Sequence, residues 1–156
     1  MADRHSPTAG TAAGIPLREL LEKFYKGFSG DTALIDQTVT PDWEDLPPHP
    51  GQEPGPDGIK PLIENIGGSF ANFSIAIHDV VDGRATDGNG LVGVRGAMLG
   101  THIGEMFGVP ATGREYSITI HEFHEIRDGR IARTWHLEDW FGWRAEATGS
   151  PSTEGE

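Results

Sequence analysis

Residues 116–140 read YSITIHEFHEIRDGRIARTWHLEDW and decide the fold class of this chain. Apolar and polar side chains alternate before and after Asp128-Gly129, and such alternation is typical of strands with one buried face. Asp-Gly is also a strong signal for a tight turn between antiparallel strands. The stretch therefore predicts a hairpin formed by strands at 116–127 and 130–140.

The turn also determines which side chains of the hairpin share a face. A two-residue turn places His121 opposite His136 and Glu122 opposite Trp135. Glu122, Trp135 and Asp139 then lie on one face, and the two histidines lie on the other. A one-residue bulge in either strand would exchange the two faces on that strand.

Upstream of the hairpin, the apolar period changes along the chain. Alternation predicts two further strands, one at 73–80 and one from 91 to about 106. Before them, apolar residues at helical spacing predict helices at 17–28, 31–39 and 59–66. Three helices followed by at least four strands predict an α+β domain, in which the helices pack on one face of a curved antiparallel sheet.

These patterns together span residues 15–144 and predict a single domain. The flanking segments 1–14 and 145–156 consist mainly of small and polar residues, so we expect both to be disordered. Within the domain, residues 41–57 are rich in proline and are expected to form a long loop. A loop of that length inside a compact domain is usually functional.

Composition limits the classes of function. The chain has 156 residues and a formal net charge of −12, so neither nucleic acid nor a membrane surface is expected as a partner. The absence of cysteine excludes disulfides, zinc ribbons, iron–sulfur clusters and thiol nucleophiles. No segment has the pattern of a signal peptide or of a membrane-spanning helix, so we expect a cytoplasmic protein.

The hairpin carries most of the candidate chemistry. Burial of Asp139 among its apolar neighbours would raise the pKa of this carboxyl toward the range useful for proton transfer, and an exposed strand end is the alternative. Trp135 is explained equally well as a core residue or as a pocket wall. His121 and His136 could bind a metal across the strand pair, but no third ligand is evident, and we expect no metal site.

Residues 100–114, GTHIGEMFGVPATGR, resemble the G-x-H-x-G-x-x-x-G-x-P-x-T-x-R stretch of the SnoaL-like polyketide cyclases. The resemblance extends over about residues 17–143. It continues, at the spacing of that family, in five further pieces: 41–45, 55–59, 128–131, Trp135 and Asp139.

The resemblance implies the cone-shaped fold of nuclear transport factor 2-like proteins, in which a bent sheet wraps an apolar pocket closed by helices. It also implies an intramolecular aldol condensation that uses no metal or cofactor. In that family a carboxylate moves the protons and a neighbouring imidazole stabilises the enolate. The two roles fall here on His136 and Glu122, so the carboxylate and the imidazole are exchanged. A polyketide or aromatic small molecule is the implied substrate, and a homodimer or higher homo-oligomer the implied assembly.

We therefore expect acid/base chemistry in this pocket. His136 is expected to act as the base with support from Glu122 or Asp139, because histidine titrates near neutral pH. Asp45 and His102 are expected to bind the oxygen that becomes negative. The other candidates would hold aromatic rings or lie at the pocket mouth: Trp43, His49, Met106, Phe107, Tyr116 and Trp135.

Two alternatives remain open at this stage. The exchanged pair would also be found in a relative that runs another reaction in the same fold, such as a retro-aldol lyase or a dehydratase acting on an aromatic substrate. It would equally be found in a non-catalytic protein that keeps the pocket and binds a small molecule.

Overall fold

The computed structural model describes residues 15–149, so the expected disorder of residues 1–14, and of residues 150–156 of the tail, falls outside the described part of the chain. The helical elements are α1 (Leu17–Gly27), α2 (Ala33–Thr38), the short 3-10 helix η1 (Pro56–Ile59), α3 (Lys60–Ser69) and α4 (Trp140–Ala147). The strands are β1 (Val39–Leu46), β2 (Phe70–Arg84), β3 (Gly90–His102), β4 (Glu115–Arg127) and β5 (Arg130–Glu138). The predicted α+β class is confirmed.

The five strands form one sheet in the order β1-β5-β4-β3-β2. The expected antiparallel pairing holds from β2 to β5, but β1 pairs with β5 in parallel, so the sheet is mixed. β1 occupies the first part of the segment expected to be a loop. Pro41 is tolerated there because β1 is an edge strand, and Trp43 anchors the strand by donating a hydrogen bond to Thr134 on β5.

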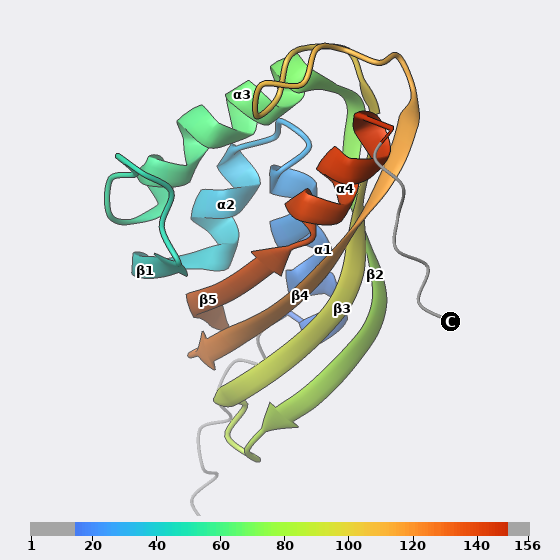
Figure 1. Cartoon of the computed structure of the whole chain (residues 1–156). Helices are drawn as coiled ribbons and strands as arrows, with labels where there is room; N and C mark the ends of the chain where they lie inside the picture. Colours follow the sequence, from blue (N-terminus) through green and yellow to red (C-terminus); the bar gives the residue numbers. More distant parts are fainter. Residues whose placement is uncertain (1–14, 150–156) are drawn as a thin grey trace, which may run out of the picture.

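The sheet curves strongly, and α1 packs against its inner face (Figure 1). Leu20, Leu21, Phe24 and Tyr25 form the buried side of α1, as the helical spacing predicts. Helices α3 and α4 lie at the end of the molecule away from the β2–β3 turn (Figure 1).

A bulge in β5 changes the register of the hairpin. Ile126 pairs with Ile131, but the next pair is Glu125 with Arg133, so Ala132 is an extra residue. From there on, Glu122 pairs with His136. The register predicted from a regular two-residue turn is therefore wrong beyond the bulge, and the two candidate catalytic side chains share a face.

Helix α4 was not anticipated from the sequence pattern, and it changes the role of Asp139. The backbone N–H of Gly142 donates to Asp139 Oδ1 at 2.8 Å, so this carboxylate is the N-cap of α4. The helix continues to Ala147, beyond the expected domain end at 144, because Trp143 is buried in the core and Arg114 donates to the carbonyl of Glu146.

Candidate active site

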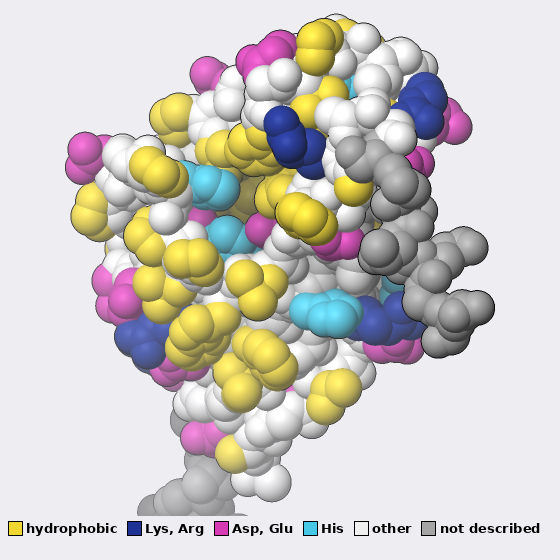
Figure 2. Space-filling model, in the orientation of Figure 1, with side chains coloured by type: hydrophobic (Ala, Val, Ile, Leu, Met, Phe, Trp, Pro, Cys, Tyr) yellow, Lys and Arg dark blue, Asp and Glu magenta, His cyan; other side chains and the backbone are white. Residues whose placement is uncertain are grey.

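A cavity of about 190 Å³ lies between the inner face of the sheet and the helices. Figure 2 shows histidine and acidic side chains gathered around a recess lined by hydrophobic side chains. The lining is mainly aromatic and aliphatic: Phe24, Phe28, Ile59, Leu62, Ile66, Phe73, Ile75, Met98, Met106, Phe107 and Trp140. Its titratable members are Tyr25, Asp45, His49, Glu105, Glu122, His136 and Glu138. The described lining contains no lysine or arginine.

Glu122 on β4 and His136 on β5 form a cross-strand pair inside this cavity. Both side chains are largely buried, with 8% and 9% of their surfaces exposed. Directly opposed residues of an antiparallel pair have Cβ atoms roughly 5 Å apart. A small ligand in the cavity can therefore reach both the carboxylate and the imidazole.

His136 is held by hydrogen bonds at both ring nitrogens. Nδ1 lies 2.7 Å from Glu138 Oε1, and Nε2 lies 2.9 Å from the carbonyl oxygen of Pro47. Both partners are acceptors, because a carbonyl oxygen cannot donate and an ionised carboxylate has no proton to donate. The ring therefore carries a proton on each nitrogen, and His136 is an imidazolium.

The electrostatics of the site support this charge state. Burial alone would lower the pKa of His136, but the hydrogen bond and charge of Glu138, the charge of Asp45 and the carbonyl of Pro47 outweigh it and raise this pKa to about 9. At neutral pH the side chain is a cation and a proton donor.

Asp45, at the end of β1, is the second carboxylate near this imidazolium. Its Oδ1 lies 3.5 Å from His136 Nε2, and its Oδ2 accepts a 3.0 Å hydrogen bond from Gln52. Burial raises the pKa of Asp45, while the charge of His136 and the hydrogen bond from Gln52 act in the opposite direction. The backbone N–H of His49 in turn donates to Gln52, so one amide links the 47–55 segment to the site.

Comparison with known proteins identifies the family. The family model described as SnoaL-like polyketide cyclase matches residues 18–146. The chain belongs to the SnoaL-like polyketide cyclase family. No curated protein sequence matches this chain.

Solved structures of this fold are numerous. IdmH from Streptomyces antibioticus, a candidate polyketide cyclase, is 26% identical with a TM-score of 0.68, over 85% of this chain and 97% of that one. TsrD from Streptomyces laurentii is 24% identical with a TM-score of 0.72, over 86% of this chain and 96% of that one. A candidate polyketide cyclase from Bacillus cereus is 24% identical with a TM-score of 0.66, over 85% and 80% of the two chains. At this level of identity the last two show a shared fold.

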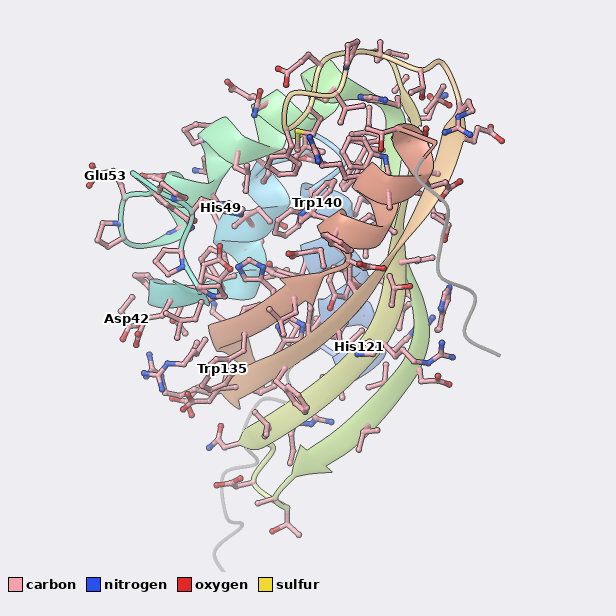
Figure 3. The ribbon with its side chains drawn as sticks, viewed as in Figure 1. Asp42, His49, Glu53, His121, Trp135 and Trp140 are labelled. Carbon is pink, nitrogen blue, oxygen red and sulfur yellow. The ribbon has the colours of Figure 1, made fainter. Side chains whose placement is uncertain are left out.

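Some of the predicted site residues line the cavity of this SnoaL-like protein, and others lie outside it. Those that line it are Asp45, His49, Met106, Phe107, Glu122 and His136. Those that lie elsewhere are Trp43, His102, Tyr116, Trp135 and Asp139. His49 and Trp140, a lining residue that was not predicted, lie on opposite sides of the cavity (Figure 3).

The excluded residues have structural reasons for their positions. Trp43 is a core residue at the β1–β5 contact, whereas Trp135 lies on the outer face of the sheet, 38% exposed (Figure 3), because of the bulge. His102 is fully buried and stacks on Phe70, and Tyr116 belongs to the same aromatic cluster, which packs around Trp143 of α4 behind the cavity wall. Asp139 is exposed and caps α4.

Sequence reasoning missed five polar members of the site: Tyr25, Asn65, Glu105, Thr134 and Glu138. Glu138 could have been found, since it lies two residues from His136 on the same strand and therefore on the same face. Tyr25 is on the buried side of α1, where its apolar neighbours suggested only a core role. It donates a 2.7 Å hydrogen bond to Glu122 Oε2.

Neither a metal site nor a membrane span is evident in the described part of the chain. Within residues 15–149, no group of three His, Asp or Glu side chains is placed to hold a metal ion. His121 lies on the outer face of the sheet (Figure 3), so it cannot bind the same metal ion as His136. No described helix has the length and apolar character needed to cross a membrane.

Proposed function

We propose that this protein is a cofactor-independent acid/base enzyme that closes a ring in a polyketide-like or aromatic small molecule by aldol chemistry. The observation that carries the proposal is the pairing of Glu122 with the imidazolium of His136 inside a mainly apolar cavity. Enolate chemistry requires a base that accepts a proton and a cationic donor that stabilises the enolate oxygen. Glu122 on β4 and His136 on β5 supply these two groups side by side.

The roles follow from the charges. His136, the base expected from the sequence, already carries both ring protons, so we assign the base role to Glu122. Glu122 removes a proton from the carbon next to a substrate carbonyl, and His136 stabilises the resulting enolate oxygen. The enolate carbon then attacks a second carbonyl of the same molecule, one C–C bond forms, and the proton returns to the new alkoxide. The product is an isomer of the substrate.

The lining also restricts the substrate. Asp45, Glu122 and Glu138 face the same space, and His136 supplies one positive charge against them. A ligand that carries its own carboxylate would be repelled there, since like charges a few ångströms apart in a partly buried site cost about 4 kcal/mol. The proposed substrate is therefore uncharged in the part that enters the cavity, and aromatic rings or an extended polyketide chain fit the apolar walls.

The test is turnover of a panel of aromatic 1,5- and 1,6-diketones, followed by mass spectrometry. Glu122→Gln keeps the side-chain size, whereas His136→Asn is smaller and removes the imidazolium; each should reduce kcat by roughly 10²–10⁴. His121→Asn on the outer face is the matched control and should keep full activity. Products of unchanged mass support ring closure, and a released fragment would assign a retro-aldol reaction instead. Tight ligand binding without any product would leave only a binding function.

We also propose that the protein forms homodimers through the outer face of the sheet. Val81, Phe123, Trp135 and Leu137 are exposed there, and Phe123 pairs directly with Trp135. A continuous apolar row on a monomer surface usually marks an interface. Phe123→Glu should convert the dimer to a monomer in sedimentation, whereas Phe141→Glu on α4 should not. A wild-type protein that sediments as a monomer at every concentration contradicts this interface.

A further inference from the structure

Behind Glu122 runs a chain of buried polar side chains that the proposed reaction does not use. Trp43 Nε1 donates to Thr134 Oγ1 at 3.1 Å, and Thr134 Oγ1 lies 3.0 Å from His124 Nδ1. His124 Nε2 lies 2.8 Å from the hydroxyl of Tyr25, and this hydroxyl lies 2.7 Å from Glu122 Oε2. The chain thus links the β1 edge of the sheet to the carboxylate in the cavity.

The members of this chain have almost no surface open to bulk solvent, although Tyr25 and Thr134 also line the cavity. His124 is fully buried, and Trp43, Tyr25 and Thr134 are each at most 2% exposed. His124 is enclosed further by the rings of Phe24 and Tyr25, which meet it edge to face. With no bulk water to compensate, each donor in the chain needs an acceptor within it.

Counting donors and acceptors leaves one arrangement of the hydrogen-bonding protons along this chain. The indole N–H of Trp43 can only donate, so Thr134 Oγ1 accepts there. The hydroxyl proton of Thr134 then has His124 Nδ1 as its acceptor, which requires Nδ1 to be unprotonated. His124 is therefore the neutral Nε2–H form; it donates to Tyr25, and Tyr25 donates to Glu122.

The other forms of His124 fail this count. A proton on Nδ1, in either the neutral tautomer or the imidazolium, would make Thr134 Oγ1 accept two hydrogen bonds. Among the described residues, the hydroxyl proton of Thr134 would then have no acceptor, although this side chain is almost fully buried. An unpaired buried donor destabilises the folded state.

We propose that Trp43, Thr134, His124 and Tyr25 are positioning residues that form a one-way donor chain ending on Glu122, which orients this carboxylate as an acceptor and reserves its Oε1 for the substrate. The proposal rests on the proposed function, because it assigns to Glu122 the role of the base. Burial, together with the charge and hydrogen bond of Glu122, raises the pKa of Tyr25 well above its ordinary value, so the phenol keeps the proton that it donates. The chain does not consume protons, since the one taken from carbon goes to Oε1.

The test is the protonation pattern of the His124 ring, measured without any ligand by ¹⁵N-edited long-range NMR at neutral pH. The His124→Phe spectrum assigns the signals by their disappearance. The wild type should show a proton-bearing Nε2 and an unprotonated Nδ1. Thr134→Val removes the donor to Nδ1 and should give a mixture of tautomers, and Thr134→Ser should restore the single form. The matched control is Thr119→Val on the outer side of β4, which should leave the His124 signals unchanged.

If the wild-type spectrum shows the His124 proton on Nδ1, or a proton on each ring nitrogen, the proposed donor chain is wrong. This outcome does not depend on any result of the activity assays. If His124 has the expected form but Glu122→Gln retains full activity, the donor chain stands and the proposed function fails. On a diketone that the wild type cyclises, Tyr25→Phe keeps the ring and should lower kcat about 10-fold at unchanged KM. An unchanged kcat would remove Tyr25 from the positioning residues.

Discussion

Replacement of His136 by asparagine should remove a specific pH dependence of stability. The folded-state pKa of His136 is about 9, against an ordinary value of 6.5. A pKa raised by folding stabilises the protein below the unfolded pKa, and this contribution is lost as the pH rises through the folded pKa. The difference corresponds to roughly 3 kcal/mol of unfolding free energy, present at about pH 5 and absent at about pH 10.

The assay is urea unfolding of wild type and His136→Asn across this pH range. The stability difference between the two proteins should shrink by roughly 3 kcal/mol from the acid to the alkaline end, with the change centred between pH 6.5 and about 9. His121→Asn, on the outer face, should show no such change. An NMR titration of the His136 ring supplies the midpoint directly. A midpoint at or below 6.5, or a pH-independent difference between the two proteins, refutes the imidazolium assignment and with it the donor role of His136.

Three further predictions use other features of the structure. Asp139→Ala should lower the unfolding free energy by about 1 kcal/mol through loss of the α4 cap, while turnover stays at the wild-type level; a collapse of kcat in a folded variant would return Asp139 to the catalytic residues. Gly96→Ala should lower the thermal midpoint in differential scanning fluorimetry, because its Cβ would lie 2.3 Å from the backbone oxygen of Ala76; an unchanged midpoint means that the β2–β3 pair can shift freely. An aromatic amide should raise the midpoint more than the matching aromatic acid, since the cavity holds several carboxylates and no lysine or arginine in its described lining; a stronger effect of the acid contradicts the charge argument.

The sequence pattern predicts the class of fold well and the edges of the elements less well. The periodicity of α1 and the Asp-Gly turn of the β4–β5 hairpin reflect local rules, so both were predictable. β1 was not, because its pairing with β5 depends on long-range contacts such as that of Trp43 with Thr134. Helix α4 is short, and its main signal is the cap at Asp139, a residue that also suggested catalysis.

The site was predictable where it depended on the identity of residues and not where it depended on register. Glu122, His136 and Asp45 were named from the sequence, and all three line the cavity. Their mutual arrangement depends on one extra residue in β5, Ala132, for which a sequence offers no clear signal. Without that bulge, Trp135 would point inward and His136 outward.

The hydrogen bond from His136 to Pro47 has a consequence for ligand binding. Nε2 carries a single proton, and the carbonyl of Pro47 already accepts it. A ligand oxygen that takes this proton must displace Pro47, so its measured affinity reports the exchange of one acceptor for another and understates the strength of the new hydrogen bond. The same exchange removes one of the contacts that hold the 47–55 segment, which carries His49 on the cavity wall and stays tied to Asp45 through Gln52. Ligand binding at Nε2 and the loss of this contact are therefore coupled, so a ligand that takes the proton also changes how firmly the segment is held.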